Sequence, residues 1–214
     1  MSTATQPDGG EPIVIIVEDD KPLRDSLRRL FRTVGLKTEE YGSAAELLEA
    51  KLPDAPGCLV LDVRLPGVSG LDLQSDLARF GIRLPIIFMT GHGDIPMSVR
   101  AMKAGAIDFL SKPFRDQDML DAVASAIERD RARRKQDGQL GGLRAQFDSL
   151  TPREREVMAL VTAGLMNKQA AHELGLSEIT VKIHRGSAMK KMGAKSLADL
   201  VKMAEALGIS RAKT

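Results

Sequence analysis

The stretch IVIIVEDD at residues 13–20 decides the fold, because five apolar residues in a row end abruptly in three carboxylates. Three further apolar runs of strand length follow it, at residues 58–61, 85–89 and 106–110. Runs that are continuously apolar, rather than alternating, are typical of a parallel sheet covered on both faces. Residues 37–41 form a weaker and more polar candidate strand, which we place at an edge of the sheet.

Helical patterns lie between these runs. Ser43 and Glu46 have the spacing of a capping box at the start of one helix. The strand and helix patterns together predict a five-fold βα repeat, that is, an α/β doubly wound five-stranded parallel sheet. One helical segment carries apolar residues at the spacing of a single helix face: Leu23, Leu27, Leu30, Phe31 and Val34.

The second half of the chain predicts a small all-α domain of four helices. Thr151, Pro152 and Glu154 mark one helix start, and Ser177 marks another. The last helix of the first half, from Asp116, continues into charged residues, and we expect it to break at 136–142, where three glycines occur. The predicted organisation is a disordered tail at 1–11, an α/β domain at 12–128, a helical extension and flexible linker at 129–147, and a helical domain at 148–214.

Charge is distributed unevenly along the 214 residues, although the net charge is only +2. Residues 11–128 carry 14 Lys or Arg against 19 Asp or Glu, whereas residues 129–214 carry 17 against 9. A basic second domain indicates nucleic acid as its partner, although random drift of surface charge would look the same. The single Cys58 excludes an internal disulfide framework. We find no signal peptide and no membrane span, and therefore expect a cytoplasmic protein without a membrane partner.

Polar residues follow the apolar runs at the points where the strands end. Glu18, Asp19 and Asp20 follow the first run, Asp62 and Thr90 follow later ones, and Ser111 with Lys112 follows the last. Ligands of an open parallel sheet bind at the carboxyl ends of its strands, so these residues predict a common site. A divalent cation relieves the repulsion between clustered carboxylates, and Mg²⁺ prefers carboxylate, water and phosphate oxygens. A carboxylate beside such a cation can accept a phosphoryl group. Solvated surface is the other reading of such an acidic cluster.

Four motifs in this order resemble the signatures of response-regulator receiver domains: VEDD at 17–20, LDVRLPG at 61–67, MTGH at 89–92 and SKPF at 111–114. The segments GHGDIPM at 91–97 and AMKAGA at 101–106 resemble the FixJ subgroup. The resemblance covers residues 13–128.

The resemblance implies a role for each residue of this site. Asp62 is the phosphoacceptor, and one Mg²⁺ is held by Asp19, Asp62, the backbone carbonyl of Arg64 and, directly or through water, Glu18. Lys112 contacts the phosphoryl group, and its bond to Pro113 is cis. Thr90 and Phe109 are the switch residues. Arg64 and His92 either tune the lifetime of the phosphate or are solvated surface.

The segment from 167 to 192 predicts a helix-turn-helix whose second helix enters the DNA major groove. On a helical wheel, Val181, Ala188 and Met192 share the core face. The opposite face carries an isoleucine at its centre, which suits contact with a thymine methyl or, alternatively, with a neighbouring helix. The residues of this opposite face are Ile179, Ile183, Gly186 and Lys190.

The segments LTPRERE at 150–156, GLMNK at 164–168 and LSEITVKIH at 176–184 resemble the LuxR-type output domain over residues 148–207. By that resemblance Lys182, Ile183 and Gly186 face DNA bases. Relatives place a longer side chain at position 186. The residues that approach phosphates are Lys168, Thr180, His184 and Lys190. For His184, packing in the protein is an equally open interpretation.

The sequence therefore predicts a phosphorylation-dependent transcription regulator of a two-component system, in the FixJ/NarL class. Its expected partners are a sensor histidine kinase, double-stranded promoter DNA and, on phosphorylation, a second copy of the chain. Such a protein assists its own phosphorylation but is not a conventional turnover enzyme. One alternative is a phosphatase with an aspartyl nucleophile, although those enzymes usually carry a second Asp where this chain has Arg64. The other is a pseudo-receiver that acts without phosphorylation.

Overall fold

The computed structural model describes residues 10–91 and 95–209, and most of the expected tail as well as His92 lie outside these ranges. Five parallel strands form one sheet in the order β2-β1-β3-β6-β7. The predicted doubly wound sheet is confirmed, and the polar strand β2 lies at its edge as expected. The strands are β1 (Ile13–Val17), β2 (Lys37–Tyr41), β3 (Gly57–Asp62), β6 (Ile86–Thr90) and β7 (Asp108–Ser111).

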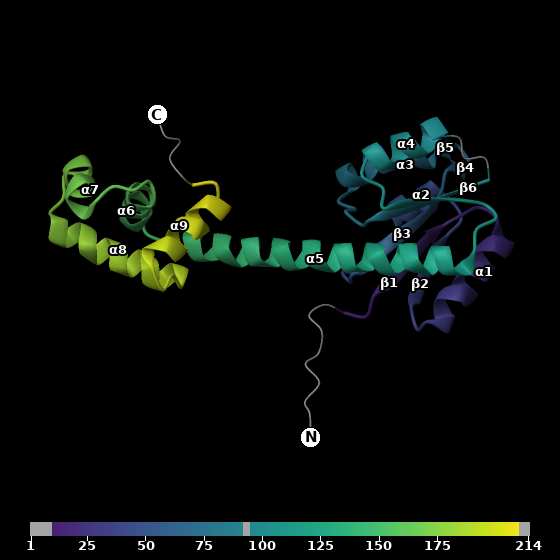
Figure 1. Ribbon diagram of the computed structural model, residues 1–214, viewed down its shortest axis with the longest axis horizontal. Helices are drawn as coiled ribbons and strands as arrows, with labels where there is room; N and C mark the ends of the chain where they lie inside the picture. Colours follow the sequence, from purple (N-terminus) through teal and green to yellow (C-terminus); the bar gives the residue numbers. More distant parts are fainter. Residues whose placement is uncertain (1–9, 92–94, 210–214) are drawn as a thin grey trace, which may run out of the picture. The chain divides into compact units, whose positions relative to one another are not determined.

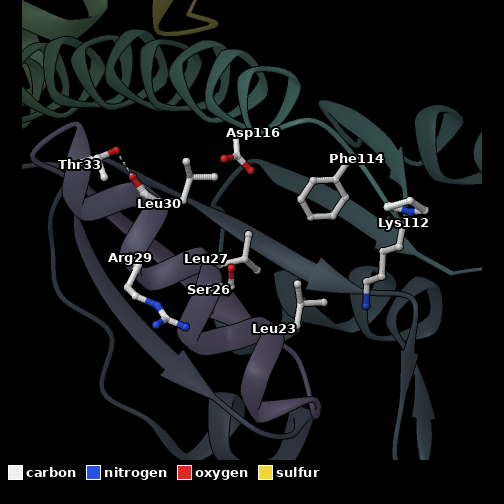
Figure 2. A pocket seen from close by; sticks show the side chains of 10 residues that line it. Leu23, Ser26, Leu27, Arg29, Leu30, Thr33, Lys112, Phe114 and Asp116 are labelled. Carbon is white, nitrogen blue, oxygen red and sulfur yellow. Dashed lines mark hydrogen bonds between the residues drawn. The ribbon is translucent and has the colours of Figure 1, made fainter.

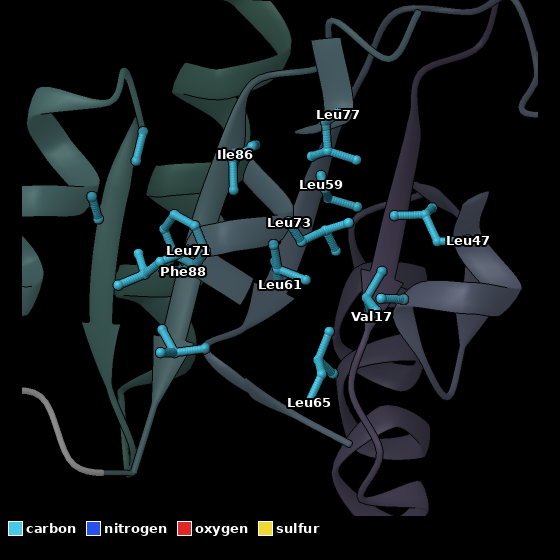
Figure 3. Packing of buried hydrophobic residues seen from close by; sticks show 14 of the residues in the cluster. Val17, Leu47, Leu59, Leu61, Leu65, Leu71, Leu73, Leu77, Ile86 and Phe88 are labelled. Carbon is cyan, nitrogen blue, oxygen red and sulfur yellow. The ribbon is translucent and has the colours of Figure 1, made fainter. Parts of the chain in front are cut away.

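Helices cover both faces of this sheet (Figure 1). On one face, α1 (Lys21–Thr33) and the first turns of α5 (Asp116–Asp148) bury Phe31 and Val123. The other face is covered by α2 (Ala44–Glu49), α3 (Gly70–Leu77) and α4 (Ile95–Lys103). Figure 3 shows the apolar side chains of that second face, with Leu59 and Leu61 of β3 near its centre. Burial on both sides explains why the strand residues are continuously apolar.

The turns around this sheet follow the expected chemistry in part. The Ser43 hydroxyl accepts a hydrogen bond from the backbone N–H of Glu46, as the predicted capping box requires. The Glu46 carboxylate accepts from Gly42 instead of from Ser43, so the box is only half formed. A short hairpin of β4 (Arg64–Leu65) and β5 (Val68–Ser69) follows Asp62, and a 3₁₀ turn η1 (Ala78–Phe80) follows α3; neither was predicted.

The expected break at 136–142 is wrong, because α5 continues without interruption to Asp148. The chain forms two compact units, and the boundary between them falls between Arg134 and Lys135, inside this helix. Exposed glycine weakens a helix without forbidding it. Leu143 and Phe147, which follow the glycines, pack against the core of the second unit and stabilise the last turns of α5.

The second unit buries one apolar core between four short helices and the end of α5. Thr151 and Glu154 form the predicted capping box, and Gly175 ends α7 in the left-handed conformation with φ of 64°. Val181, Ala188 and Met192 are buried, which confirms the predicted core face of α8. The helices are α6 (Pro152–Thr162), α7 (Asn167–Leu174), α8 (Glu178–Met192) and α9 (Leu197–Ala206).

Among residues 10–91 and 95–209, every helix is too short or too polar to cross a lipid bilayer.

Asp130 on α5 is a fully buried carboxylate at the end of the apolar stripe of that helix. Its Oδ2 atom accepts hydrogen bonds from the backbone N–H of Gly57, at 3.1 Å, and from Arg134 Nε, at 2.7 Å. Its Oδ1 atom accepts from Arg133. This carboxylate therefore joins α5 to the first residue of β3.

We predict that Asp130→Ala lowers the free energy of unfolding of the first unit by about 1–3 kcal/mol, because the buried N–H of Gly57 loses its acceptor. Asp121→Ala on the exposed face of the same helix serves as the control, with an expected change within about 0.5 kcal/mol. Urea unfolding followed by circular dichroism measures both changes. Equal midpoints for the two variants would contradict this role of Asp130.

Candidate functional site

The ends of the central strands lie side by side because the strands pair in parallel register. Val17 of β1 pairs with Leu61 of β3, so Glu18 and Asp62 are the next residues on neighbouring strands. Thr90 ends β6 and pairs with Ser111 of β7. The register thus brings the polar residues that follow separate apolar runs to one edge of the sheet.

Three carboxylates gather at this edge. One carboxylate oxygen from each of Glu18, Asp19 and Asp62 lies within 4.8 Å of the others. Glu18 is 1% exposed and Asp62 is 6% exposed, whereas Asp19 is open to solvent. Burial raises the pKa of the Glu18 carboxyl above its ordinary value, and the nearby Asp62 charge adds to this, although the hydrogen bond from Lys112 opposes it.

Lys112 supplies positive charge to these carboxylates. Its Nζ atom lies 2.6 Å from Glu18 Oε2 and 3.1 Å from Asp62 Oδ2. Burial alone would lower the pKa of the Lys112 ammonium, but its hydrogen bonds to Glu18 and Asp62 outweigh burial and raise it. The Lys112–Pro113 peptide bond is cis, as predicted. Lys112 is therefore a charged ammonium in contact with the phosphoacceptor candidate.

The two expected switch residues, Thr90 and Phe109, lie on neighbouring strands. Thr90 is fully buried, and its carbonyl accepts a hydrogen bond of 2.7 Å from the backbone N–H of Lys112. Phe109 is half-buried, and its ring lies 6.3 Å from that of Phe88 at an interplanar angle of 48°. A threonine beside Lys112 and a partly exposed aromatic ring on the next strand can couple the carboxylate edge to the surface around β7.

The backbone around Asp62 adds contacts that sequence analysis missed. The backbone N–H of Arg64 donates to Asp62 Oδ1 at 3.3 Å, and the Arg64 side chain is exposed. Gly70, the first residue of α3, donates to the Val63 carbonyl at 2.8 Å. A Cβ atom at Gly70 would lie 2.4 Å from the Asp62 carbonyl oxygen, so only glycine fits there. A glycine directly before the apolar residues Leu71 and Leu73 is the signal that could have identified this contact.

The donor set fits a hard divalent cation. Carboxylate oxygens are the ligands that Mg²⁺ prefers, and Glu18, Asp19 and Asp62 offer them from two adjacent strand ends. Asp20 is exposed, and its backbone N–H donates to Glu18 Oε1 at 3.3 Å. Asp20 therefore contributes through its backbone and is not part of the carboxylate cluster.

A partly apolar groove of about 710 Å³ adjoins Lys112 (Figure 2). It lies along α1, where Leu23 and Leu30 line it, and Phe114 closes it beside Lys112. Arg29 and Asp116 supply charged groups at its margin. The groove is thus a partly apolar surface next to Lys112.

The helix α8 presents a second candidate site, an exposed face of the second unit. Lys182 and Gly186 are exposed, and Ile179 and Ile183 are 74% and 62% exposed. Most of the Ile183 side chain is therefore open to solvent and is not covered by a neighbouring helix. Exposed apolar side chains on a single helix face indicate a binding surface.

The expected phosphate-facing residues occupy less uniform positions. Lys168 on α7 and Lys190 on α8 are exposed, whereas His184 is half-buried between the two faces of α8. The Thr180 hydroxyl lies 2.8 Å from that of Ser177, the residue that caps α8.

Two side-chain contacts that sequence analysis missed hold α8 in place. Arg185 donates to Asn167 Oδ1 on α7 at 3.1 Å. Lys191 lies 2.6 Å from the buried Glu154 of α6, and its proximity lowers the pKa of that carboxyl. Each contact joins residues far apart in sequence, so no local pattern reveals it.

The chain resembles known proteins over nearly all of its length. Residues 14–124 match the response regulator receiver domain, and residues 148–204 match the luxR family of bacterial regulatory proteins. Nodulation protein W of Bradyrhizobium diazoefficiens is 64% identical over 198 residues, covering 92% of this chain and 87% of that protein. Transcriptional regulatory protein FixJ of Azorhizobium caulinodans is 41% identical over 199 residues, covering 93% and 94%. The solved structure of response regulator StyR matches with a TM-score of 0.80 and 47% identity, covering 92% of this chain and 99% of that one.

We predict that Gly186→Ala raises the free energy of unfolding of the second unit by up to about 1 kcal/mol, because alanine is the better helix former. A Cβ atom there meets no atom of residues 10–91 and 95–209 within 4 Å, so no clash with them offsets the gain. Thermal unfolding measures the change, with Ser187→Ala as a control on the same helix. A lower melting temperature for Gly186→Ala would refute the prediction.

Proposed function

The chain belongs to the response regulators that join a receiver domain to a LuxR-type DNA-binding domain, and we propose that phosphorylation of Asp62 switches its activity as a transcription regulator. The observation that carries this proposal is the contact of Lys112 with Asp62 inside the cluster of Glu18 and Asp19. In this proposal residues 12–128 are the receiver, 129–147 the helical extension and linker, and 148–214 the output domain.

Phosphoryl transfer requires positioning and charge neutralisation more than covalent help. Asp62 attacks the phosphorus atom, and the leaving group departs from the opposite side. Mg²⁺, bound by Asp19, Asp62, the Arg64 carbonyl and Glu18, would neutralise charge on the phosphoryl oxygens. Lys112 exchanges its contact with Asp62 for one with a phosphoryl oxygen. The receiver thus assists its own phosphorylation without being a metabolic enzyme.

The phosphoryl donor in this proposal is a sensor histidine kinase. A phosphohistidine on a partner must come within bonding distance of Asp62, so the partner has to bind beside the carboxylate edge. The groove along α1 offers Leu23, Leu30 and Phe114 at that place (Figure 2).

Phosphorylation then draws the Thr90 hydroxyl toward the phosphate, and Phe109 rotates into the space that this movement leaves.

DNA binding is assigned to the exposed face of α8. Lys182, Ile183 and Gly186 face bases in the major groove, where an isoleucine suits a thymine methyl. Further contacts to phosphates increase affinity without adding sequence information. These contacts come from Lys168, Thr180, His184 and Lys190.

In this proposal, dimerisation links the phosphorylation of Asp62 to DNA binding by α8. The helix α4 precedes β7, the strand that carries Phe109, and exposes three apolar side chains: Ile95, Val99 and Met102. One output domain offers a single recognition helix, whereas two on a twofold axis read half-sites about one DNA turn apart. We assign the dimer surface to 97–103 together with Phe109.

We predict that Asp62→Asn abolishes labelling by a radioactive small phosphodonor with Mg²⁺. The amide has nearly the size of the carboxylate but lacks the negatively charged oxygen that acts as the nucleophile. Asp76→Asn, remote from the carboxylate edge, should be labelled like the wild type. Labelling of Asp62→Asn at the wild-type level would disprove the assignment. Turnover of the donor without a stable protein adduct would favour the phosphatase alternative, and no labelling of the wild type would favour a pseudo-receiver.

We predict that Lys182→Ala relaxes specificity at one base pair by about 1–3 kcal/mol, since a base contact discriminates between sequences. Lys190→Ala should instead weaken binding to all sequences about equally. Titrations against a panel of single-base variants of the DNA site measure both. A uniform loss with Lys182→Ala would make Lys182 a phosphate contact.

We predict that Val99→Glu leaves labelling of Asp62 intact but prevents dimerisation, because burying an unpaired carboxylate in an apolar interface is unfavourable. Sedimentation before and after stoichiometric phosphorylation measures the mass, with Ser75→Glu as an exposed control. A phosphorylated wild type that stays monomeric while its DNA affinity rises would defeat the dimer proposal.

A further inference from the structure

Arg24 lies at the start of α1, directly beside the turn that carries the acidic residues. The side chain is half-buried, and its Nη1 atom donates a hydrogen bond to the backbone carbonyl of Glu18. None of the roles assigned above uses this arginine.

This hydrogen bond completes a set of contacts that hold the Glu18 backbone from both sides. The N–H of Glu18 donates to the carbonyl of Tyr41 at 3.1 Å, and its carbonyl accepts from Arg24. The peptide unit that contains this carbonyl is planar and ends at the Cα atom of Asp19. Its orientation therefore fixes the direction of the N–Cα bond of Asp19, about which the Asp19 side chain is placed.

Asp19 depends on that orientation because its own carboxylate has little else to hold it. The side chain is exposed, and across residues 10–91 and 95–209 no hydrogen bond or ion pair to its carboxylate is present. Glu18 differs, since Lys112 and the Asp20 backbone hold its two oxygens. The least restrained member of the carboxylate cluster is thus the one next to the carbonyl that Arg24 holds.

The guanidinium group of Arg24 also lies near the turn that follows β2. A Cβ atom at Gly42 would lie 3.6 Å from Arg24 Nη1 and 3.5 Å from Glu46 Oε2. The N–H of Gly42 donates to the same Glu46 oxygen at 2.7 Å, which fixes the turn after β2. Arg24 therefore lies between two turns at the carboxyl ends of adjacent strands. A planar guanidinium can fix the direction of a hydrogen bond in a way that a flexible lysine ammonium does not.

We propose that Arg24 is a positioning residue for phosphoryl transfer, which orients the Glu18–Asp19 peptide so that the Asp19 carboxylate faces Asp62 and a divalent cation. The inference rests on the function proposed for Asp62. Arg24 contacts neither the phosphoryl group nor the cation. Its effect reaches the cation site only through the Asp19 backbone.

The test compares Arg24→Ala, Arg24→Gln and Arg24→Lys with Arg32→Ala. Arg32 is the matched control, because it is an exposed arginine of the same helix and is not among the residues that line the groove along α1. Calorimetric titration with Mg²⁺ alone gives the dissociation constant. The initial rate of labelling from a small phosphodonor at saturating Mg²⁺ gives the effect on the reaction.

We expect Arg24→Ala to weaken Mg²⁺ binding by about 10–100-fold, the range typical of residues that orient metal ligands, and to slow labelling. Arg32→Ala should change neither quantity more than twofold. Arg24→Gln keeps a donor without the charge and should recover part of the lost affinity. If Arg24→Lys restores full affinity while Arg24→Gln restores none, charge alone matters and the orienting role is overturned. Unchanged Mg²⁺ affinity in Arg24→Ala overturns it as well.

Melting temperatures of the metal-free variants identify any that are misfolded, and the three substitutions at one position provide an alternative if Arg24→Ala fails to fold. The Mg²⁺ titration does not depend on labelling. If the wild type binds Mg²⁺ but is never labelled, the function proposed for Asp62 fails, while the effect of Arg24 on the cation site is still measured.

Discussion

The parallel direction of all five strands is the constraint on which the rest of the receiver depends. It brings every carboxyl end to one edge of the sheet, so Glu18 and Asp62, 44 positions apart in the chain, become neighbours. The same geometry forces like charges together, which is unfavourable unless a cation is present. Lys112, which follows the last strand, provides that charge within the protein itself. An additional cation therefore enters an edge where some of the repulsion is already offset.

Much of this edge could be predicted from sequence, because two simple rules locate it. Continuously apolar runs identified β1, β3 and β6, and the first polar residue after each run identified Glu18, Asp62 and Thr90. The polar strand β2 was correctly placed at the sheet edge for the same reason. What the rules could not supply is backbone detail. The β4–β5 hairpin has strands of only two residues, too short for any periodicity, and the close approach of Gly70 to Asp62 depends on it.

In the second unit too, features set by local sequence could be predicted, whereas contacts between distant residues could not. A helical wheel separated the buried face of α8 from the exposed one, since burial repeats with the period of the helix. The contacts of Arg185 with Asn167 and of Lys191 with Glu154 join different helices, and only the packed fold brings them together. For helix α5, the prediction from local sequence alone was wrong. Local propensity predicted an end at the glycines, but Leu143 and Phe147 beyond them gain burial only if the helix continues.

Those glycines still have a physical effect inside the continuous helix. Gly138, Gly141 and Gly142 are exposed, and a Cβ atom at any of them would meet no atom of the described part of the chain within 4 Å. Each disfavours a helix by about 1 kcal/mol relative to alanine, and no side-chain packing returns that energy. Backbone hydrogen bonds in this part of α5 therefore break by local fluctuation at a much lower free energy than those around the buried Val123. Amide protons near the glycines should exchange with solvent well before those on either side, so that one continuous helix has a weakly protected stretch between two better protected ends.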